Sequence, residues 1–223
     1  SWHPRLLDEL LIFRMISSIT WGSADGRGLW LGRYDDGNMF FAVKDDGDSK
    51  TMREWELNKD GSLPDVPTNS FELELRSRPW YSIPTAKGKG AWTDPYPWAG
   101  GNESQTETIG VSFGLPLYNE DSTLIGVIDA DYQLSDLNDF LHSIDAGKNG
   151  IVILATDEGL LLAASNDIPL NVKDGSLQYL SRAEDEVIAR MGVLVENSDS
   201  NQNFSDTIMI RNQSYYIHMS PVG

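Results

Sequence analysis

Apolar side chains near the start of the chain recur at helical spacing. Over residues 5–16 they fall on one stripe of a helix: Leu6, Leu7, Leu10, Leu11 and Met15. This spacing predicts an amphipathic helix whose apolar stripe faces a core or a second copy of the chain.

From about residue 16 the pattern changes to short β-type runs separated by turns. Asp-Gly pairs fall at 25–26, 36–37, 46–47 and 60–61, between runs such as "LWLGRY", "MFFAV" and "MREWEL". Asp-Gly between such runs is a strong hairpin signal. The segment therefore predicts an antiparallel meander.

The stretch 78–98, "RPWYSIPTAKGKGAWTDPYPW", is dense in aromatic residues and interrupted by four prolines. We expect neither a core helix nor a core strand there. The apolar runs at 108–118 and 123–132 predict a further hairpin. A helix follows, with Leu134, Leu137, Phe140, Leu141 and Ile144 on one face and Ser135 as its N-cap.

A turn-rich segment at 145–150 predicts a domain boundary. Beyond it we expect strands at 150–156 and 160–165, a helix at 182–195, and two strands joined by a turn at Asn212. The predicted fold class is therefore α+β.

The charge balance excludes several classes of partner. The net charge is −17, which argues against nucleic acid and anionic membrane surfaces.

There is no cysteine, and the three histidines lie far apart, so we expect no metal site and no cofactor. The longest apolar segment, near residues 6–19, carries charged residues and is too short to span a membrane, so we expect a soluble piece of a longer protein.

One cation lies within the aromatic stretch, and one carboxylate follows a later apolar run. Arg78 can bind a carboxylate through two parallel hydrogen bonds, and Asp131 follows an apolar run. With aromatic walls between them, they predict a pocket for a small zwitterion. The alternative is that Arg78 makes a surface ion pair, Asp131 caps the next helix, and the tryptophans belong to the core.

Two other functions are open to test. The segment "GVSFG" at 110–114 matches the G-x-S-x-G elbow and makes Ser112 a formal hydrolase nucleophile, although no helix is predicted after it. Alternatively, Trp80, Trp92 and Trp98 could form the exposed stacking platform of a carbohydrate-binding module.

The ordered segments "RPWY", "WTDPY", 115–141 and 147–165 together resemble the double Cache sensor domains of bacterial transmembrane receptors. The resemblance implies a long N-terminal helix and two PAS-like modules, each a mostly antiparallel sheet with flanking helices. It implies an N-terminal stalk helix at 1–20, a membrane-distal module with the ligand pocket at 16–144, and a membrane-proximal module at 145–223.

The resemblance also implies which residues bind the ligand. In the subgroup that recognises amino acids, residues matching Arg78, Trp80, Tyr81 and Tyr96 engage the ligand carboxylate, and the residue matching Asp131 binds its ammonium group. Trp98 stands where that subgroup has a second aspartate, and Leu73 where it has a tyrosine. We include Trp98 among the predicted ligand-binding residues and expect a larger ligand, an amine, a purine-like molecule or a carboxylate as well as an amino acid.

The resemblance finally implies a setting. We expect a non-enzymatic, periplasmic or extracellular sensor domain of an inner-membrane histidine kinase, diguanylate cyclase or chemoreceptor, with flanking transmembrane helices outside this sequence. We expect it to dimerise through the N-terminal helix and to bind a small molecule in the distal module.

Overall fold

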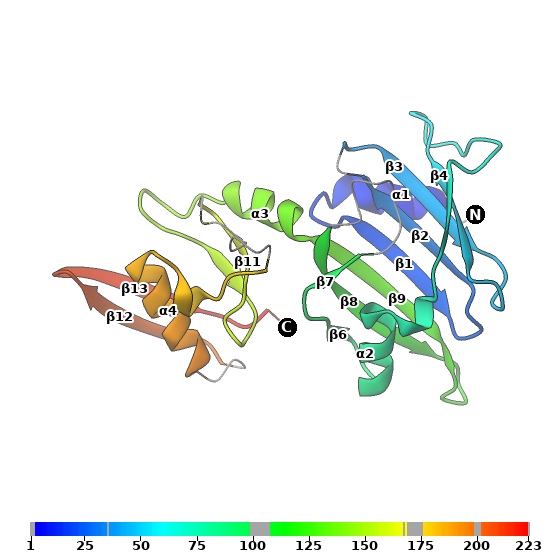
Figure 1. Ribbon diagram of the computed structural model, residues 1–223. Coiled ribbons are helices and arrows are strands. Elements are labelled where there is room, and N and C mark those ends of the chain that lie inside the picture. Colours follow the sequence, from blue (N-terminus) through cyan, green and yellow to red (C-terminus); the bar gives the residue numbers. More distant parts are fainter. Residues whose placement is uncertain are drawn as a thin grey trace. The chain divides into compact units, whose positions relative to one another are not determined.

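The structure is a computed structural model that describes residues 3–34, 36–98, 108–166, 168, 176–198 and 202–222. The chain divides into two compact units, Ser1–Asp136 and Leu137–Gly223 (Figure 1). Within the described residues, none of the helices is long and apolar enough to cross a membrane.

The first unit is built on one antiparallel sheet. Among the described residues it has nine strands: β1 Ser18–Ser23, β2 Gly28–Arg33, β3 Met39–Lys44, β4 Thr51–Glu56, β5 Asn69–Glu72, β6 Ala91–Trp92, β7 Tyr96–Pro97, β8 Ile109–Tyr118 and β9 Leu124–Gln133. The strand order is β5-β4-β3-β2-β1-β9-β8-β6, and β7 also pairs with β8 (Figure 1). The return of β9 to pair with β1 places the last strand of the unit beside the first.

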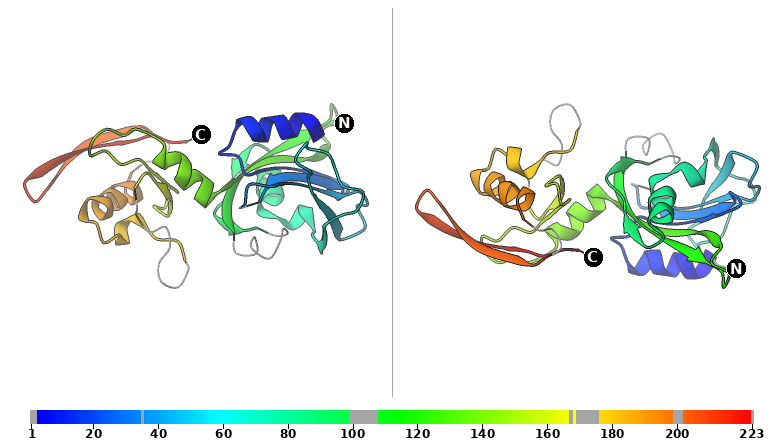
Figure 2. Two further views of the ribbon diagram at one scale, coloured as in Figure 1. Left: turned by 90° about the horizontal axis from the view of Figure 1, so that it is seen from above. Right: turned by 90° about the horizontal axis from the view of Figure 1, so that it is seen from below.

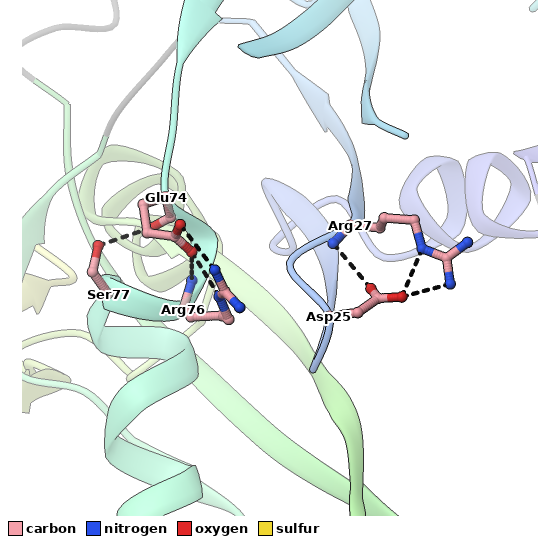
Figure 3. Close-up of polar contacts among 5 residues, drawn as sticks. All are labelled: Asp25, Arg27, Glu74, Arg76 and Ser77. Atoms are coloured by element: carbon pink, nitrogen blue, oxygen red, sulfur yellow. Dashed lines mark hydrogen bonds and ion pairs between the residues drawn. The ribbon is translucent and has the colours of Figure 1, made fainter. Parts of the chain in front are cut away.

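The Asp-Gly turns lie where the sequence predicts them. Gly26, Gly37 and Gly61 have positive φ angles, which glycine adopts without steric cost. Figure 3 shows Asp25 bridging the first of these turns, where its carboxylate accepts hydrogen bonds from the backbone N–H and the guanidinium of Arg27. The antiparallel meander is confirmed.

The two faces of the sheet are covered by different helices (Figure 2). Helix α1, His3–Ile12, packs on β1 and β2 with Leu10 against Leu31 and Leu57. Helix α2, Pro79–Lys87, lies on the opposite face, where the buried cluster includes Trp30, Phe40, Ala42, Trp80 and Tyr81. We call this second face the inner face.

The N-terminal helix is shorter than predicted. It ends at Ile12, and β1 begins at Ser18, so a helix over residues 1–20 is wrong for this structure. The reason is that Ser18–Ser23 pairs along its length with both β2 and β9. Tertiary pairing overrides the helical continuation of the pattern.

The aromatic stretch contains more regular structure than predicted. A 3-10 helix, η1 Leu75–Ser77, leads into α2, with Pro79 at the first helical turn, where proline is tolerated. Pro84 lies inside α2, and its ring faces Gly114 of β8. The expectation of no core helix in this stretch is therefore wrong, because α2 packs on the sheet and buries Trp80, Tyr81 and Pro84.

The second unit contains shorter elements. They are α3 Leu134–His142, which begins within the first unit, β10 Ile153–Ala155, β11 Leu161–Ala164, η3 Leu180–Arg182, α4 Glu186–Glu196, β12 Phe204–Ile210 and β13 Gln213–Met219. Two hairpins, β10-β11 and β12-β13, accompany α4, whose N-terminus is capped by Asp185. Ser135 lies inside α3 and does not cap it. The assignment of this unit to a Cache module stays a prediction.

Candidate functional site

One pocket lies on the inner face of the first unit. The space between its lining residues, counted together with the open solvent at its mouth, is about 310 Å³. Side chains from the sheet and from the segment 73–98 line it: Thr20, Trp30, Leu73, Leu75, Arg78, Trp80, Tyr96, Trp98 and Asp131. The predicted cation, the predicted carboxylate and three of the predicted aromatic residues therefore share one pocket.

Asp131 lies on the floor of the pocket within a shell of hydroxyl groups. Its neighbours in register are Ser18 on β1 and Ser112 on β8. Ser18 Oγ donates to Asp131 Oδ2 at 2.5 Å, and Ser112 Oγ donates to Oδ1 at 2.5 Å. Thr20 Oγ1 lies 3.4 Å from Oδ2. Burial raises the pKa of Asp131, and these hydrogen bonds partly oppose the rise.

A second carboxyl lies beside the first. Asp129 is two residues earlier on β9, on the same face, and its Oδ1 accepts a hydrogen bond from Thr20 N at 3.1 Å. Burial raises the pKa of Asp129 well above its usual value, and the neighbouring Asp131 adds to the rise. Two buried carboxyls this close disfavour double ionisation, so the pair holds a proton more readily than an isolated aspartate.

Arg78 is positioned by the start of α2. It follows η1, which Glu74 caps by accepting from Arg76 N and from the Arg76 guanidinium, while Ser77 Oγ donates to the Glu74 carbonyl (Figure 3). The Arg78 guanidinium is 5.3 Å from the centre of the Tyr96 ring, and Nη2 donates to the Pro97 carbonyl at 2.7 Å. Its remaining N–H groups can serve a ligand.

Tyr96 is held by an interrupted edge strand. Strand β6 pairs with Phe113 and Gly114, and β7 pairs with Ile109 and Gly110. Prolines are tolerated at such an edge because the outer side needs no N–H donors. Tyr96 Oη and Ser112 Oγ are 2.8 Å apart, so a chain of hydrogen bonds joins Tyr96 through Ser112 to Asp131. Burial, followed by the charge of Asp131, raises the pKa of Tyr96.

The remaining predicted residues divide into two groups. Trp80 and Trp98 are buried and line the pocket. Tyr81 is also buried but is not among the lining residues; its ring lies against Gly22 of β1. Leu73, which the resemblance marks as a departure, does line the pocket. The ligand-binding roles of all these residues stay predictions.

Sequence reasoning missed Thr20, Trp30 and Leu75. Thr20 and Trp30 are cross-strand neighbours on β1 and β2. A signal was present: Trp30 alternates with Gly28 and Gly32, so a large ring stands between two positions without side chains on one face of the strand. Such a pattern indicates that other groups approach the strand closely on either side of the ring, and here Leu75 lies over Gly28 and Phe40 over Gly32.

The structure contradicts both alternative functions. Ser112 lies within β8, not in a strand–turn–helix elbow, and its hydroxyl is engaged by Asp131 and Tyr96. Trp80 and Trp98 are 5% and 9% exposed, whereas Trp92 is 37% exposed. Three tryptophans of such different exposure do not form one open stacking platform. In the described residues, no group of three or more His, Asp or Glu side chains is arranged to hold a metal ion.

Comparisons with known proteins agree on the type of domain. Residues 34–139 match the family described as "Methyl-accepting chemotaxis protein-like, first PDC sensor domain". The matched residues span strands β3–β9 and include the residues carried by η1 and α2. No relative was found among curated protein sequences.

Solved structures share the fold, among them the following three. The extracellular domain of mmHK1S-Z2, assigned as a histidine kinase, is 15% identical, with a TM-score of 0.52, over 97% of this chain and 74% of that chain. The corresponding domain of mmHK1S-Z3 is 12% identical, with a TM-score of 0.50, over 95% of this chain and 69% of that chain. The sensory domain of the Campylobacter jejuni chemoreceptor Tlp3 is 17% identical, with a TM-score of 0.50, over 96% of this chain and 66% of that chain.

At these identities the similarity to solved structures is one of fold. The fold is a mostly antiparallel sheet with few helices, of the α+β class, and the family match covers the segment that carries most of the pocket. Residues 34–139 are therefore similar to a sensor region of the PDC type.

Proposed function

We propose that the chain is an extracytoplasmic, ligand-binding sensor domain of a bacterial receptor, and that its pocket in the first unit binds a small polar ligand such as an amino acid, an amine or a carboxylate. The sensor fold and the family match support the class of protein. The observation that carries the proposal is that Arg78 and Asp131 line the same pocket, with aromatic side chains around them.

The two charged groups suit the two ends of such a ligand. Asp131 accepts hydrogen bonds from three hydroxyl groups and also lies against Asp129, so a ligand ammonium group would compete with the proton of this carboxyl pair for the remaining acceptor position. Arg78 has donors beyond the one that Pro97 accepts. A ligand ammonium group at Asp131 and a ligand carboxylate at Arg78 would each gain a charge-assisted hydrogen bond.

The receptor setting is part of the same proposal. The first unit is the membrane-distal module, the second unit is the membrane-proximal one, and the full receptor is a histidine kinase, a diguanylate cyclase or a chemoreceptor that dimerises through its N-terminal helix. Ligand binding favours one of two states of the receptor, and the strength of the signal is set by the difference in affinity between them.

A thermal-shift screen tests the binding. Amino acids, amines, purines and organic acids are each added to the wild type, to Arg78→Ala and to Asp131→Asn. A ligand at one hundred times its dissociation constant stabilises the folded state by about 2.7 kcal/mol, which raises the melting temperature by several degrees. We expect at least one compound to do so in the wild type and to lose its effect in both variants.

The exposed Asp94 provides the matched control, because Asp94→Asn removes the same charge outside the pocket. A ligand-induced shift that survives both pocket variants, or no shift with any compound class, would contradict the proposal.

A further inference from the structure

Two tryptophans of the pocket carry hydrogen-bond donors that lack partners. Trp30 and Trp98 are 6% and 9% exposed, and both line the pocket. Among the described residues, neither indole Nε1–H finds an acceptor. Buried side-chain donors are satisfied in most native structures, so two such donors around one pocket indicate that a bound molecule supplies the acceptors.

The indole of Trp30 is fixed before any ligand arrives. Its ring meets Phe40 edge-to-face at 5.0 Å and Phe71 at 6.5 Å between centres. Its strand neighbour is Thr20, whose N–H and hydroxyl are directed to Asp129 and Asp131. The ring of Trp30 is thus preorganised on the β2 side of the pocket, and its strand neighbour Thr20 contacts the carboxyls on β9.

Around this pocket, the side chains with N–H donors outnumber the carboxylates. Arg78, Trp30 and Trp98 offer N–H groups, whereas Asp131 is the one carboxylate among the lining residues. A ligand that brought only a cationic group would satisfy Asp131 and leave the indole donors unpaired. A ligand with an acceptor on its body satisfies both sides.

We propose that Trp30 is a specificity-determining residue of the pocket, and that its indole N–H donates to a hydrogen-bond acceptor on the body of the ligand, such as an amide carbonyl. Trp98 offers a second donor of the same kind. The pocket then selects compounds that combine a cationic group with a separate acceptor, over compounds of the same shape that lack the acceptor. This inference rests on the proposed ligand-binding function.

Pairs of isosteric probes test the selection, whatever the natural ligand is. L-asparagine and L-leucine have the same branched outline, but only asparagine has a side-chain carbonyl. β-Alaninamide and 3-methylbutylamine form the same pair without the α-carboxylate. We expect the amide member of a pair to bind the wild type more tightly, since a site built for a hydrogen bond rejects an analogue that cannot make it.

The decisive variant is Trp30→Phe, which keeps an aromatic ring and removes the donor. We expect the ratio of dissociation constants within a pair to fall by on the order of tenfold. Trp92→Phe is the matched control, because Trp92 packs on Phe113 and Tyr132 and is not among the lining residues. It should leave the ratio unchanged.

A measurement on the wild type covers the case in which Trp30→Phe does not fold. The chain has seven tryptophans, whose indole N–H signals can be followed by ¹⁵N-labelled NMR. Asparagine or β-alaninamide should move a slowly exchanging indole proton downfield, and the apolar member of the pair should not. Equal shifts with both members, or none, would overturn the inference.

The outcomes separate this inference from the proposed function. If Asp131→Asn abolishes binding while Trp30→Phe leaves the ratio unchanged, the pocket binds ligands and the role of Trp30 is wrong. Equal or weaker binding of the amide members to the wild type also overturns it. If none of the four probes binds in the millimolar range, the inference fails for amide acceptors, whereas the proposed function still rests on the wider screen.

Discussion

Thr20 donates one hydrogen bond to each of two buried carboxyls on β9: its backbone N–H to Asp129 Oδ1 at 3.1 Å, and its hydroxyl to Asp131 Oδ2 at 3.4 Å. The two carboxyls are 3% and 4% exposed. Only Asp131 lines the pocket, so Asp129 acts on the site through its neighbour. Protonation of Asp129 therefore changes the electrostatic environment of the carboxyl that lines the pocket.

The first prediction concerns stability and pH. The folded state raises the pKa of Asp129 well above 3.8, so it binds a proton that the unfolded chain releases above that pH. Stability contributed by this proton is present at low pH and is lost as pH rises from 3.8 through the pKa of the folded state. We expect the melting temperature to fall as the pH rises above 3.8 and through the raised pKa of Asp129.

Asp129→Asn should flatten this dependence. Asparagine can accept from Thr20 N as aspartate does, and it carries no charge to bury. The variant should be more stable than the wild type at about pH 8, by about 1.4 kcal/mol for each unit of pKa rise that it removes. Asp94→Asn, at an exposed position, is the control. An unchanged slope in Asp129→Asn would show that Asp129 does not hold the proton.

The second prediction concerns Ser112, which joins Tyr96 to Asp131. Ser112→Ala removes the hydroxyl between them and leaves two buried groups each short of one partner. Leaving buried polar groups unsatisfied costs about 1–3 kcal/mol, so urea unfolding should show a loss of stability in that range. Ligand affinity should fall as well, because Asp131 loses one of its orienting hydrogen bonds.

The same variant, Ser112→Ala, also tests the hydrolase alternative. Thr123→Ala, in the turn between β8 and β9 and outside the pocket, is a control for hydroxyl removal. We expect neither the wild type nor Ser112→Ala to hydrolyse an activated ester above the background rate. Turnover that disappears with Ser112→Ala would instead restore the hypothesis of a serine nucleophile.

Local patterns are sufficient to predict much of the first unit. The Asp-Gly turns predict the β1–β5 meander because each turn joins adjacent strands and its geometry is set by nearby residues. Likewise, residue type and family resemblance select Arg78, Tyr96 and Asp131, and the structure places all three around one pocket.

Non-local packing accounts for what the sequence does not predict. Helix α2 contains Pro84 and is not expected from its pattern, but Gly114 allows the backbone of Trp80 to lie directly on β8. The place of Trp30 in the pocket depends on β2 lying next to β1, which brings it beside Thr20. The pattern of residues 18–33 alone does not show that Trp80 of α2 and Tyr96 of β7 line the same pocket as Trp30.

The third prediction concerns a buried lysine. Lys44 is 1% exposed on the inner face of β3, and its Nζ has no hydrogen-bond partner among the described residues. Replacing a buried charge by an apolar side chain of similar length is often neutral or stabilising. Lys44→Met should therefore raise the free energy of unfolding by about 1–3 kcal/mol in urea titrations.

Lys50→Met is the matched control, because it makes the same replacement at an exposed position. It should change stability by less than about 0.5 kcal/mol. A marked loss of stability in Lys44→Met would mean that the ammonium group is paired in solution, with Glu74 as the first candidate because the charge of Lys44 helps to lower the pKa of Glu74.

The fourth prediction tests the contact that positions Trp98. A Cβ added to Gly110 of β8 would lie 2.5 Å from Cζ2 and 2.6 Å from Nε1 of Trp98, closer than atoms can pack. Gly110→Ala should displace the indole, lower stability by about 1–3 kcal/mol and weaken ligand binding. In a Trp98→Phe background the same change should be less harmful, because the smaller ring leaves room for the methyl group. A double-mutant cycle measured by urea unfolding gives this coupling, and additive effects of the two changes would show that the indole does not pack on Gly110.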